Sequence, residues 1–137
     1  MTRSVVFVLD RSALIRYANL DGLAVGEMIQ IAGEEAGVAG VPAQCFLDAY
    51  SVLDQGGRGR LVALVSTPHA NVEVLALLAG DVVEVARSAP VVVAEVGGHA
   101  VVEARRRDLP LATYQGKAAR MVLDDDQVLD LVEPGDG

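Results

Sequence analysis

Near its start the chain carries the run Val5-Val6-Phe7-Val8-Leu9-Asp10-Arg11-Ser12-Ala13-Leu14-Ile15. Unbroken apolar residues that stop at a carboxylate predict a strand buried on both faces. Ser12 is a candidate N-cap for a helix that begins at Ala13. Asp10 therefore stands where a parallel strand ends, the edge at which open α/β sheets bind ligands. We expect it to be either a site residue or the cap of the following helix.

Length and composition predict one domain that covers residues 1–137. The chain has 137 residues, of which 52% are hydrophobic and 4% aromatic, so valine, leucine and alanine must fill the core. One cysteine excludes an intramolecular disulfide and is compatible with a reducing cytoplasm. No apolar stretch approaches the roughly 20 residues that span a bilayer, so we expect a cytoplasmic protein without a membrane partner. A net charge of −8 argues against nucleic-acid binding by bulk charge, but permits a local basic patch.

Apolar periodicity predicts an alternation of strands and helices along the whole chain. Expected strands cover residues 5–9, 37–42, 72–77, 109–114 and 128–132. Expected helices cover residues 13–17, 23–36, 43–54, 61–66 and 81–88, with a short one in 115–121. Residues 55–60, rich in glycine, are expected to form a loop, and residues 133–137 a frayed tail. Val91–Val93 alone resembles a strand, although the segment onward to Arg107 can continue as a helix. The predicted fold is a three-layer α/β/α sandwich around a parallel sheet of about five strands.

Four segments resemble the PIN-domain ribonucleases. Leu9-Asp10-Arg11-Ser12-Ala13-Leu14 is similar to the Leu-Asp-Thr-Ser-Ala-Leu that ends the first strand of this family. Residues 41–50 are similar to the helix that carries the second family acid, with Asp48 at its place. Residues 72–77 resemble the third strand, and residues 96–113 the helix-then-strand unit that ends in a Thr-x-Asp motif. The resemblance covers nearly the whole chain and implies a PIN-like fold, related to toxin ribonucleases of bacterial toxin–antitoxin pairs.

The resemblance also implies a metal site that is incomplete here. Active PIN enzymes gather three or four carboxylates around Mg²⁺ or Mn²⁺, which activates a water and stabilises the oxyanions of the phosphodiester. Asp10 and Asp48 are the retained acids and the expected metal ligands and catalytic residues. The third acid falls at Ala94, or at Val96 or Gly97 in other registers, and none of these is acidic. The fourth falls at Gln115.

Two further acids are candidates to replace the third one. Glu95 substitutes only if the helix is shifted, because one residue rotates a helical side chain by about 100°. Glu103 lies too far along the same helix. With about two of four acids present, we expect weak or absent metal binding and little or no nuclease activity.

Three functional interpretations follow. The first is a degenerate PIN-like domain with a binding or regulatory role toward RNA, an antitoxin-like protein or a second copy in a homodimer. The second is an active Mg²⁺- or Mn²⁺-dependent endoribonuclease toxin, in which Glu95 completes the site. Its phosphate-guiding residues would be Arg58, Arg60, Arg105, Arg106 and Arg107.

The third, ranked low, is a doubly wound phosphoryl-signalling domain, suggested by the run of acids at 124–126. These acids precede the last strand, and no glycine-rich loop follows the first strand. Against all three stands the simple alternative that Asp10 is only a helix cap, Asp48 is only partly exposed, and the crevice binds nothing. Likewise, the arginines at 105–107 can serve only to stabilise a helix end.

Overall fold

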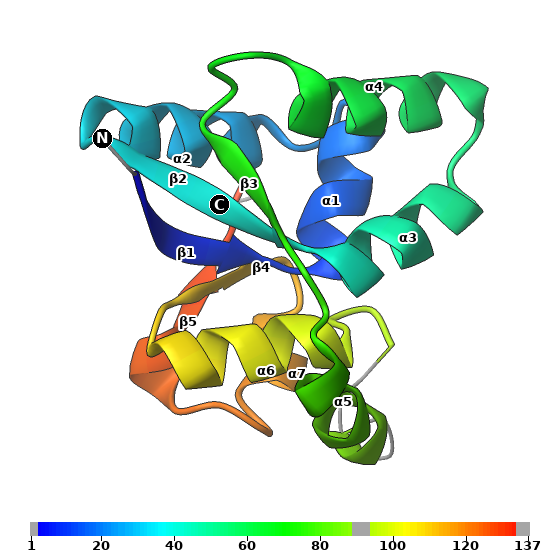
Figure 1. The fold of residues 1–137 in the computed structure, drawn as a ribbon. Coiled ribbons are helices and arrows are strands. Elements are labelled where there is room, and N and C mark those ends of the chain that lie inside the picture. Colours follow the sequence, from blue (N-terminus) through cyan, green and yellow to red (C-terminus); the bar gives the residue numbers. More distant parts are fainter. Residues whose placement is uncertain (1–2, 89–93, 134–137) are drawn as a thin grey trace.

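The computed structural model describes residues 3–88 and 94–133, which form one parallel sheet with helices on both faces (Figure 1). The strands are β1 (Ser4–Leu9), β2 (Gly37–Pro42), β3 (Val72–Leu75), β4 (Leu111–Thr113) and β5 (Val128–Asp130). The helices are α1 (Arg11–Ala18), α2 (Leu23–Glu34), α3 (Ala43–Val52), α4 (Gln55–Ser66), α5 (Val82–Ser88), α6 (Gly98–Arg107) and α7 (Gly116–Ala119). Two 3₁₀ helices complete the set, η1 (Ala79–Asp81) and η2 (Asp125–Gln127). The predicted sandwich with five parallel strands is confirmed.

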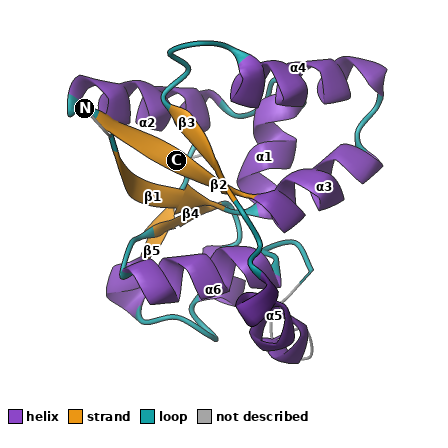
Figure 2. Cartoon of the chain, in the orientation of Figure 1, coloured by secondary structure: helices purple, strands orange, loops and turns teal. Residues whose placement is uncertain are grey.

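The sheet has the order β3-β2-β1-β4-β5, which places β1 at its centre. Val8 of β1 pairs with Gly40 on one side and with Leu111 on the other. α1 to α4 cover one face of the sheet and α5 to α7 the other (Figures 1 and 2). A strand covered on both faces must be apolar throughout, and Val8 and Leu9 indeed have no exposed surface. The first apolar run therefore forms the middle of the core, and its carboxyl end brings Asp10 to the edge where α1 begins.

The N-cap of α1 is Asp10, and the expectation that Ser12 caps this helix was wrong. β1 ends at Leu9, Asp10 keeps an extended backbone, and its Oδ1 accepts a hydrogen bond of 2.9 Å from the Ala13 amide. Ser12 lies inside the first helical turn and donates its own hydroxyl to the same carboxylate. The helix starts as soon as the strand stops, so the carboxylate rather than the hydroxyl meets the free amide.

Residues 55–60 were expected to form a loop, and this was also wrong, because α4 begins at Gln55. Asp54 caps the helix by accepting a 2.8 Å hydrogen bond from the Gly57 amide. Further along the same helix, Leu61 and Leu64 are buried in the core. The cap and this buried face together outweigh the low helix propensity of the three glycines.

α6 begins later than expected. Residues 94–96 form a turn, and Gly97 precedes the helix with φ of +94°, a conformation that suits glycine. The Val96 carbonyl accepts a hydrogen bond from the Arg11 amide, which fixes this turn against the start of α1. Glu95 is thus exposed in a turn rather than carried on a helix. The strand or helix considered at Val91–Val93 lies outside the described residues.

The ends of the chain and of several strands also differ from expectation. β3, β4 and β5 each stop one or two residues before the predicted boundary. Glu133, assigned to a frayed tail, is anchored: its carboxylate accepts hydrogen bonds from the Leu23 and Ala24 amides and from the Tyr114 hydroxyl. Residues 134–137 lie outside the described part. Within the described ranges, the helices are too short or too polar to cross a bilayer.

Candidate functional site

Asp10 lies in a closed polar cluster at the carboxyl ends of β1 and β4. Its side chain has no exposed surface. One oxygen accepts from the Ala13 amide and the Ser12 hydroxyl, at 2.9 and 2.7 Å, and the other accepts from the Thr113 hydroxyl. Thr113 is itself fully buried and accepts from the Gln115 amide at 2.8 Å. Both carboxylate oxygens therefore already have partners, and the group serves as a buried cap that joins α1 to β4.

Burial dominates the ionisation of this group. It raises the pKa of Asp10 from 3.8 to about 7, although the hydrogen bonds from Thr113 and Ser12 favour the charged form and lower it. Burial, and then the charges of Asp10 and Asp48, raise the pKa of the Cys45 thiol. Cys45 is almost fully buried and behaves as the small hydrophobic residue expected from the sequence.

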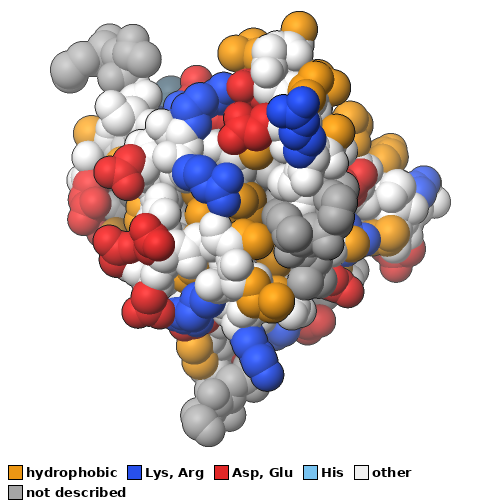
Figure 3. Space-filling model, turned by 90° about the horizontal axis from the view of Figure 1, so that it is seen from below, with side chains coloured by type: hydrophobic (Ala, Val, Ile, Leu, Met, Phe, Trp, Pro, Cys, Tyr) orange, Lys and Arg blue, Asp and Glu red, His pale blue; other side chains and the backbone are white. Residues whose placement is uncertain are grey.

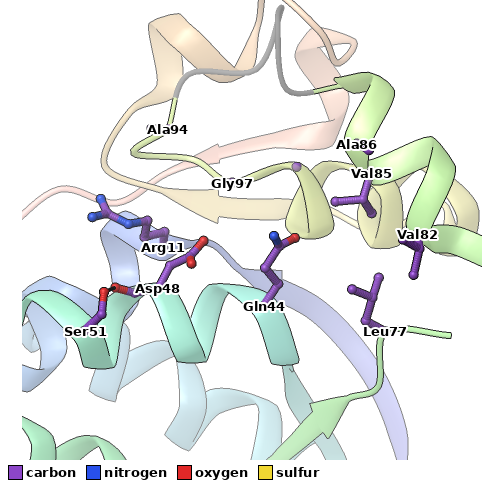
Figure 4. A pocket seen from close by; sticks show the side chains of 11 residues that line it. Arg11, Gln44, Asp48, Ser51, Leu77, Val82, Val85, Ala86, Ala94 and Gly97 are labelled. Carbon is purple, nitrogen blue, oxygen red and sulfur yellow. Dashed lines mark hydrogen bonds between the residues drawn. The ribbon is translucent and has the colours of Figure 1, made fainter. Parts of the chain in front are cut away.

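Next to this cluster, a cleft of about 550 Å³ opens at the same edge of the sheet (Figure 4). One side of the cleft is polar and consists of Arg11 at the start of α1 together with Gln44, Asp48 and Ser51 of α3, which we call the α3 wall. Opposite lies an apolar side, the α5 wall, made of Leu77, Val82, Val85 and Ala86. Ala94, Gly97 and Gly98 close the cleft between them. Asp10 is not among its lining residues.

Three polar groups of the cleft are uncommitted. The Arg11 guanidinium and the Asp48 carboxylate have no hydrogen bond or ion pair to another described residue. The Gln44 Oε1 atom is buried and has no hydrogen-bond partner in the described part of the chain. Gln44 and Asp48 extend from α3 toward the segment that carries Ala94 and Gly97 (Figure 4). Because Gln44 Oε1 is buried, the uncommitted groups of this wall that a ligand can reach directly are those of Arg11 and Asp48.

The predicted metal ligands differ in their surroundings. Asp10 is buried and accepts a hydrogen bond on each oxygen, whereas Asp48 is exposed in the cleft beside Arg11. Glu95 and Gln115 are exposed, and neither lines the cleft. Within the described ranges, no group of three or more His, Cys, Asp or Glu side chains is arranged to hold a metal ion. A single available carboxylate next to a guanidinium does not fit Mg²⁺ or Mn²⁺, which prefer several oxygen ligands.

The arginines predicted to bind RNA have partners within the fold. Arg58 donates to the Tyr50 and Ser51 carbonyls at the end of α3, with its guanidinium over the Tyr50 ring. Arg60 donates to the Ala18 carbonyl at the end of α1. These contacts are made to carbonyls in the last turns of α3 and α1, where intrahelical donors run out.

The cluster at the end of α6 is engaged in the same way. Arg105 donates to the Val122 carbonyl, while Arg106 and Arg107 form ion pairs with Glu103, which is fully buried. Arg106 also pairs with Asp81. On this side of the molecule, basic side chains lie among acidic ones (Figure 3). The cleft residue Gly98 is the first residue of α6, so these arginines lie at the other end of the helix, away from the cleft.

Sequence reasoning missed Arg11, Gln44 and the α5 wall as parts of the cleft. It also missed His99, which is fully buried and accepts a hydrogen bond from the Gln44 amide. The sequence held one sign of the His99 contact: Pro42, before α3, has no side chain that can cap a helix, so the cap had to come from elsewhere.

No protein-family model matches the chain, and no curated protein matches it either.

Proposed function

We propose that this chain is a PIN-like domain that binds a segment of a partner protein in the cleft and has little or no nuclease activity. The local resemblance of residues 9–14 and 41–50 to PIN-domain ribonucleases supports the family, and the parallel sheet agrees with it. Binding rather than cleavage is supported by what the cleft offers: a polar wall with uncommitted groups and an apolar wall facing it.

The observation that carries the proposal is the state of Asp10. A carboxylate that binds a catalytic metal must present an oxygen lone pair to the cleft, yet both oxygens of Asp10 are occupied and the side chain has no exposed surface. To reach a metal, it would have to give up the cap of α1 or the bond to Thr113. This leaves Asp48 as the one acid among the described residues that line the cleft, too few to hold a divalent ion firmly.

A protein segment fits the cleft better than RNA does. RNA brings a phosphate at every nucleotide, whereas the net charge is −8 and the cleft has one arginine, Arg11, among its described residues. A peptide brings a carbonyl or carboxylate for Arg11 and an apolar side chain for the α5 wall. A basic side chain in the segment would meet Asp48. An antitoxin-like protein is one such partner, and a second copy of the chain remains a separate prediction.

Metal and RNA titrations test the loss of catalysis. We expect calorimetry with Mn²⁺ to show no stoichiometric binding, and labelled single-stranded RNA to stay intact with Mg²⁺ or Mn²⁺. Tight Mn²⁺ binding together with metal-dependent cleavage that Asp10→Asn abolishes would instead establish the active endoribonuclease. In that case Asp10 must leave its buried position, and the proposal is wrong.

Peptide selection tests the binding role. A displayed library of random peptides is panned against the protein, and enriched sequences are synthesised and measured by calorimetry. We expect them to combine an apolar residue with a basic one and to lose at least about tenfold in affinity on Asp48→Asn, as expected for a charge-assisted contact. Asp126→Asn, an exposed acid outside the cleft, is the matched control and should leave affinity unchanged. Equal losses in both variants, or no enriched peptide, would contradict a peptide site at the α3 wall.

A further inference from the structure

The first turn of α3 has an unusual cap. Its N-cap residue is Pro42, which has no side-chain acceptor, so the amides of this turn need partners from elsewhere. The Gln44 amide donates to Nδ1 of His99, at 3.3 Å, across 55 positions of sequence. His99 belongs to α6 and has no exposed surface. A histidine on the opposite side of the sheet thus supplies the acceptor that the sequence around α3 lacks.

This contact fixes the tautomer of His99. An Nδ1 that accepts a hydrogen bond carries no proton, so the neutral ring must be protonated at Nε2. Nε2 lies 3.2 Å from Glu103 Oε1 and donates to it. The Glu103 carboxylate is in turn held by Arg106 and Arg107, at 2.6 and 2.7 Å. Every polar atom of the ring is therefore paired while the ring is neutral.

We infer that His99 is the cap that holds the α3 wall in place, and that protonation of its ring releases the first turn of α3. A proton on Nδ1 would put one donor against another, the ring N–H against the Gln44 N–H, and the cap would be lost. The same turn carries the Gln44 side chain into the cleft, and Asp48 follows one turn later. Acid would thereby loosen the polar wall of the site. The effect on ligand binding rests on the function proposed above, but the capping itself does not.

The surroundings of His99 favour the neutral ring near neutral pH. The charged groups that act on it are Glu103 and Arg106 of α6 and Asp81 of η1, and from α3 the Gln44 amide donates to the ring. Glu103 and Asp81 favour the charged ring, but burial outweighs them and lowers the pKa of His99 below its ordinary value of 6.5. The cap is therefore present at pH 6.5 and above, and it is lost as pH falls through the lowered pKa of His99.

Nuclear magnetic resonance of the free protein tests the inference without any ligand. The chain has two histidines, so His69→Asn leaves His99 as the only imidazole. His69 is exposed with φ of +64°, and Asn accepts that backbone conformation. At pH 7.5 we expect ring ¹⁵N shifts of a neutral imidazole protonated at Nε2. When the ring is titrated below pH 6.5, the hydrogen-exchange rate of the Gln44 amide, corrected for its intrinsic rate, should increase about threefold to tenfold. This is the factor expected from the loss of one hydrogen bond.

An internal control separates the cap from general acid unfolding. The Gly57 amide, capped by Asp54 at the start of α4, should keep its protection over the same range. His99→Phe keeps an aromatic ring but removes the acceptor, so Gln44 should exchange about threefold to tenfold faster already at pH 7.5. If that variant does not fold, the ring titration of the His69→Asn protein still decides the question. A ring protonated at Nδ1, a charged ring at pH 7.5, or unchanged Gln44 exchange after protonation would overturn the inference, whatever the cleft binds.

Discussion

Replacement of Asp10 by Asn should stabilise the protein at high pH. In the folded chain the pKa of Asp10 is about 7, against 3.8 for the ordinary group, so the folded state binds this proton about 1000-fold more tightly than the unfolded state does. Stability from this group is therefore full below pH 3.8 and falls as pH rises to about 7. At roughly 1.4 kcal/mol per pH unit, the total loss is about 4 kcal/mol. Asn cannot ionise and escapes this loss.

The neutral side chain also preserves most of the local contacts. Asn is as good an N-cap as Asp, so its oxygen keeps the Ala13 amide, while its NH₂ group faces Thr113. One imperfect hydrogen bond costs about 1 kcal/mol, which leaves a net gain of about 3 kcal/mol at pH 8. The gain should be roughly 2 to 3 kcal/mol smaller at pH 5, where the folded wild-type group is protonated.

Urea unfolding at pH 5 and pH 8, followed by circular dichroism, measures this difference. Asp54→Asn is the matched control, because Asp54 caps α4 in the same way but is exposed. Its change in the free energy of unfolding should be small and equal at the two pH values. If Asp10→Asn instead lowers stability at pH 8, the ionised carboxylate is favourable there. The description of Asp10 as a buried cap whose ionisation costs stability would then be wrong, and a metal-binding role would regain support.

Four further substitutions have definite expected outcomes. Gly97→Ala should lower the free energy of unfolding in urea by about 1 to 3 kcal/mol, because φ is +94° and the new Cβ would lie 2.9 Å from the Cys45 sulfur. Gly59→Ala should instead stabilise α4 by roughly 0.5 to 1 kcal/mol, because the space around Gly59 is open. Leu14→Ala should cost about 2 to 5 kcal/mol in the same assay, since Leu14 is fully buried in the core. Glu133→Gln should lower the urea midpoint more at pH 7 than at pH 3. The hydrogen bond from Tyr114 and those from α2 lower the pKa of Glu133, so its contribution is present above the ordinary value of 4.5 and lost below it. An equal effect of Glu133→Gln at both pH values would show that its charge is irrelevant.

The sequence was sufficient for the fold class because its apolar runs are long and regular. Every residue from Val5 to Leu9 is apolar, a pattern typical of a strand covered on both faces. The alternation of strands and helices along the chain then implies a parallel sheet. Local sequence pattern predicted residues 55–60 wrongly. Their glycines disfavour a helix locally, and the compensation comes from a cap at Asp54 and a buried face further along, which local propensity does not weigh.

The site was harder to predict than the fold. Asp10 was correctly placed at the end of a strand, but its burial depends on Thr113, which lies 103 positions away. His99 could not be assigned as the cap of α3 because that contact joins α6 to α3 across the sheet. Arg11 and Gln44 line the cleft only because the turn before Gly97 closes over them. The spacing of apolar residues does not predict such a turn. In each of these cases the role of the residue depends on a contact with a residue far away in the sequence.

The placement of Arg58 and Arg60 has a consequence for how the molecule opens. Each arginine belongs to α4 and closes the last turn of another helix, α3 in one case and α1 in the other. These three helices are therefore tied at their ends as well as packed along their sides, and we expect them to unfold together as one cooperative unit. Loss of either guanidinium should separate this unit into parts that exchange their amide hydrogens at different rates.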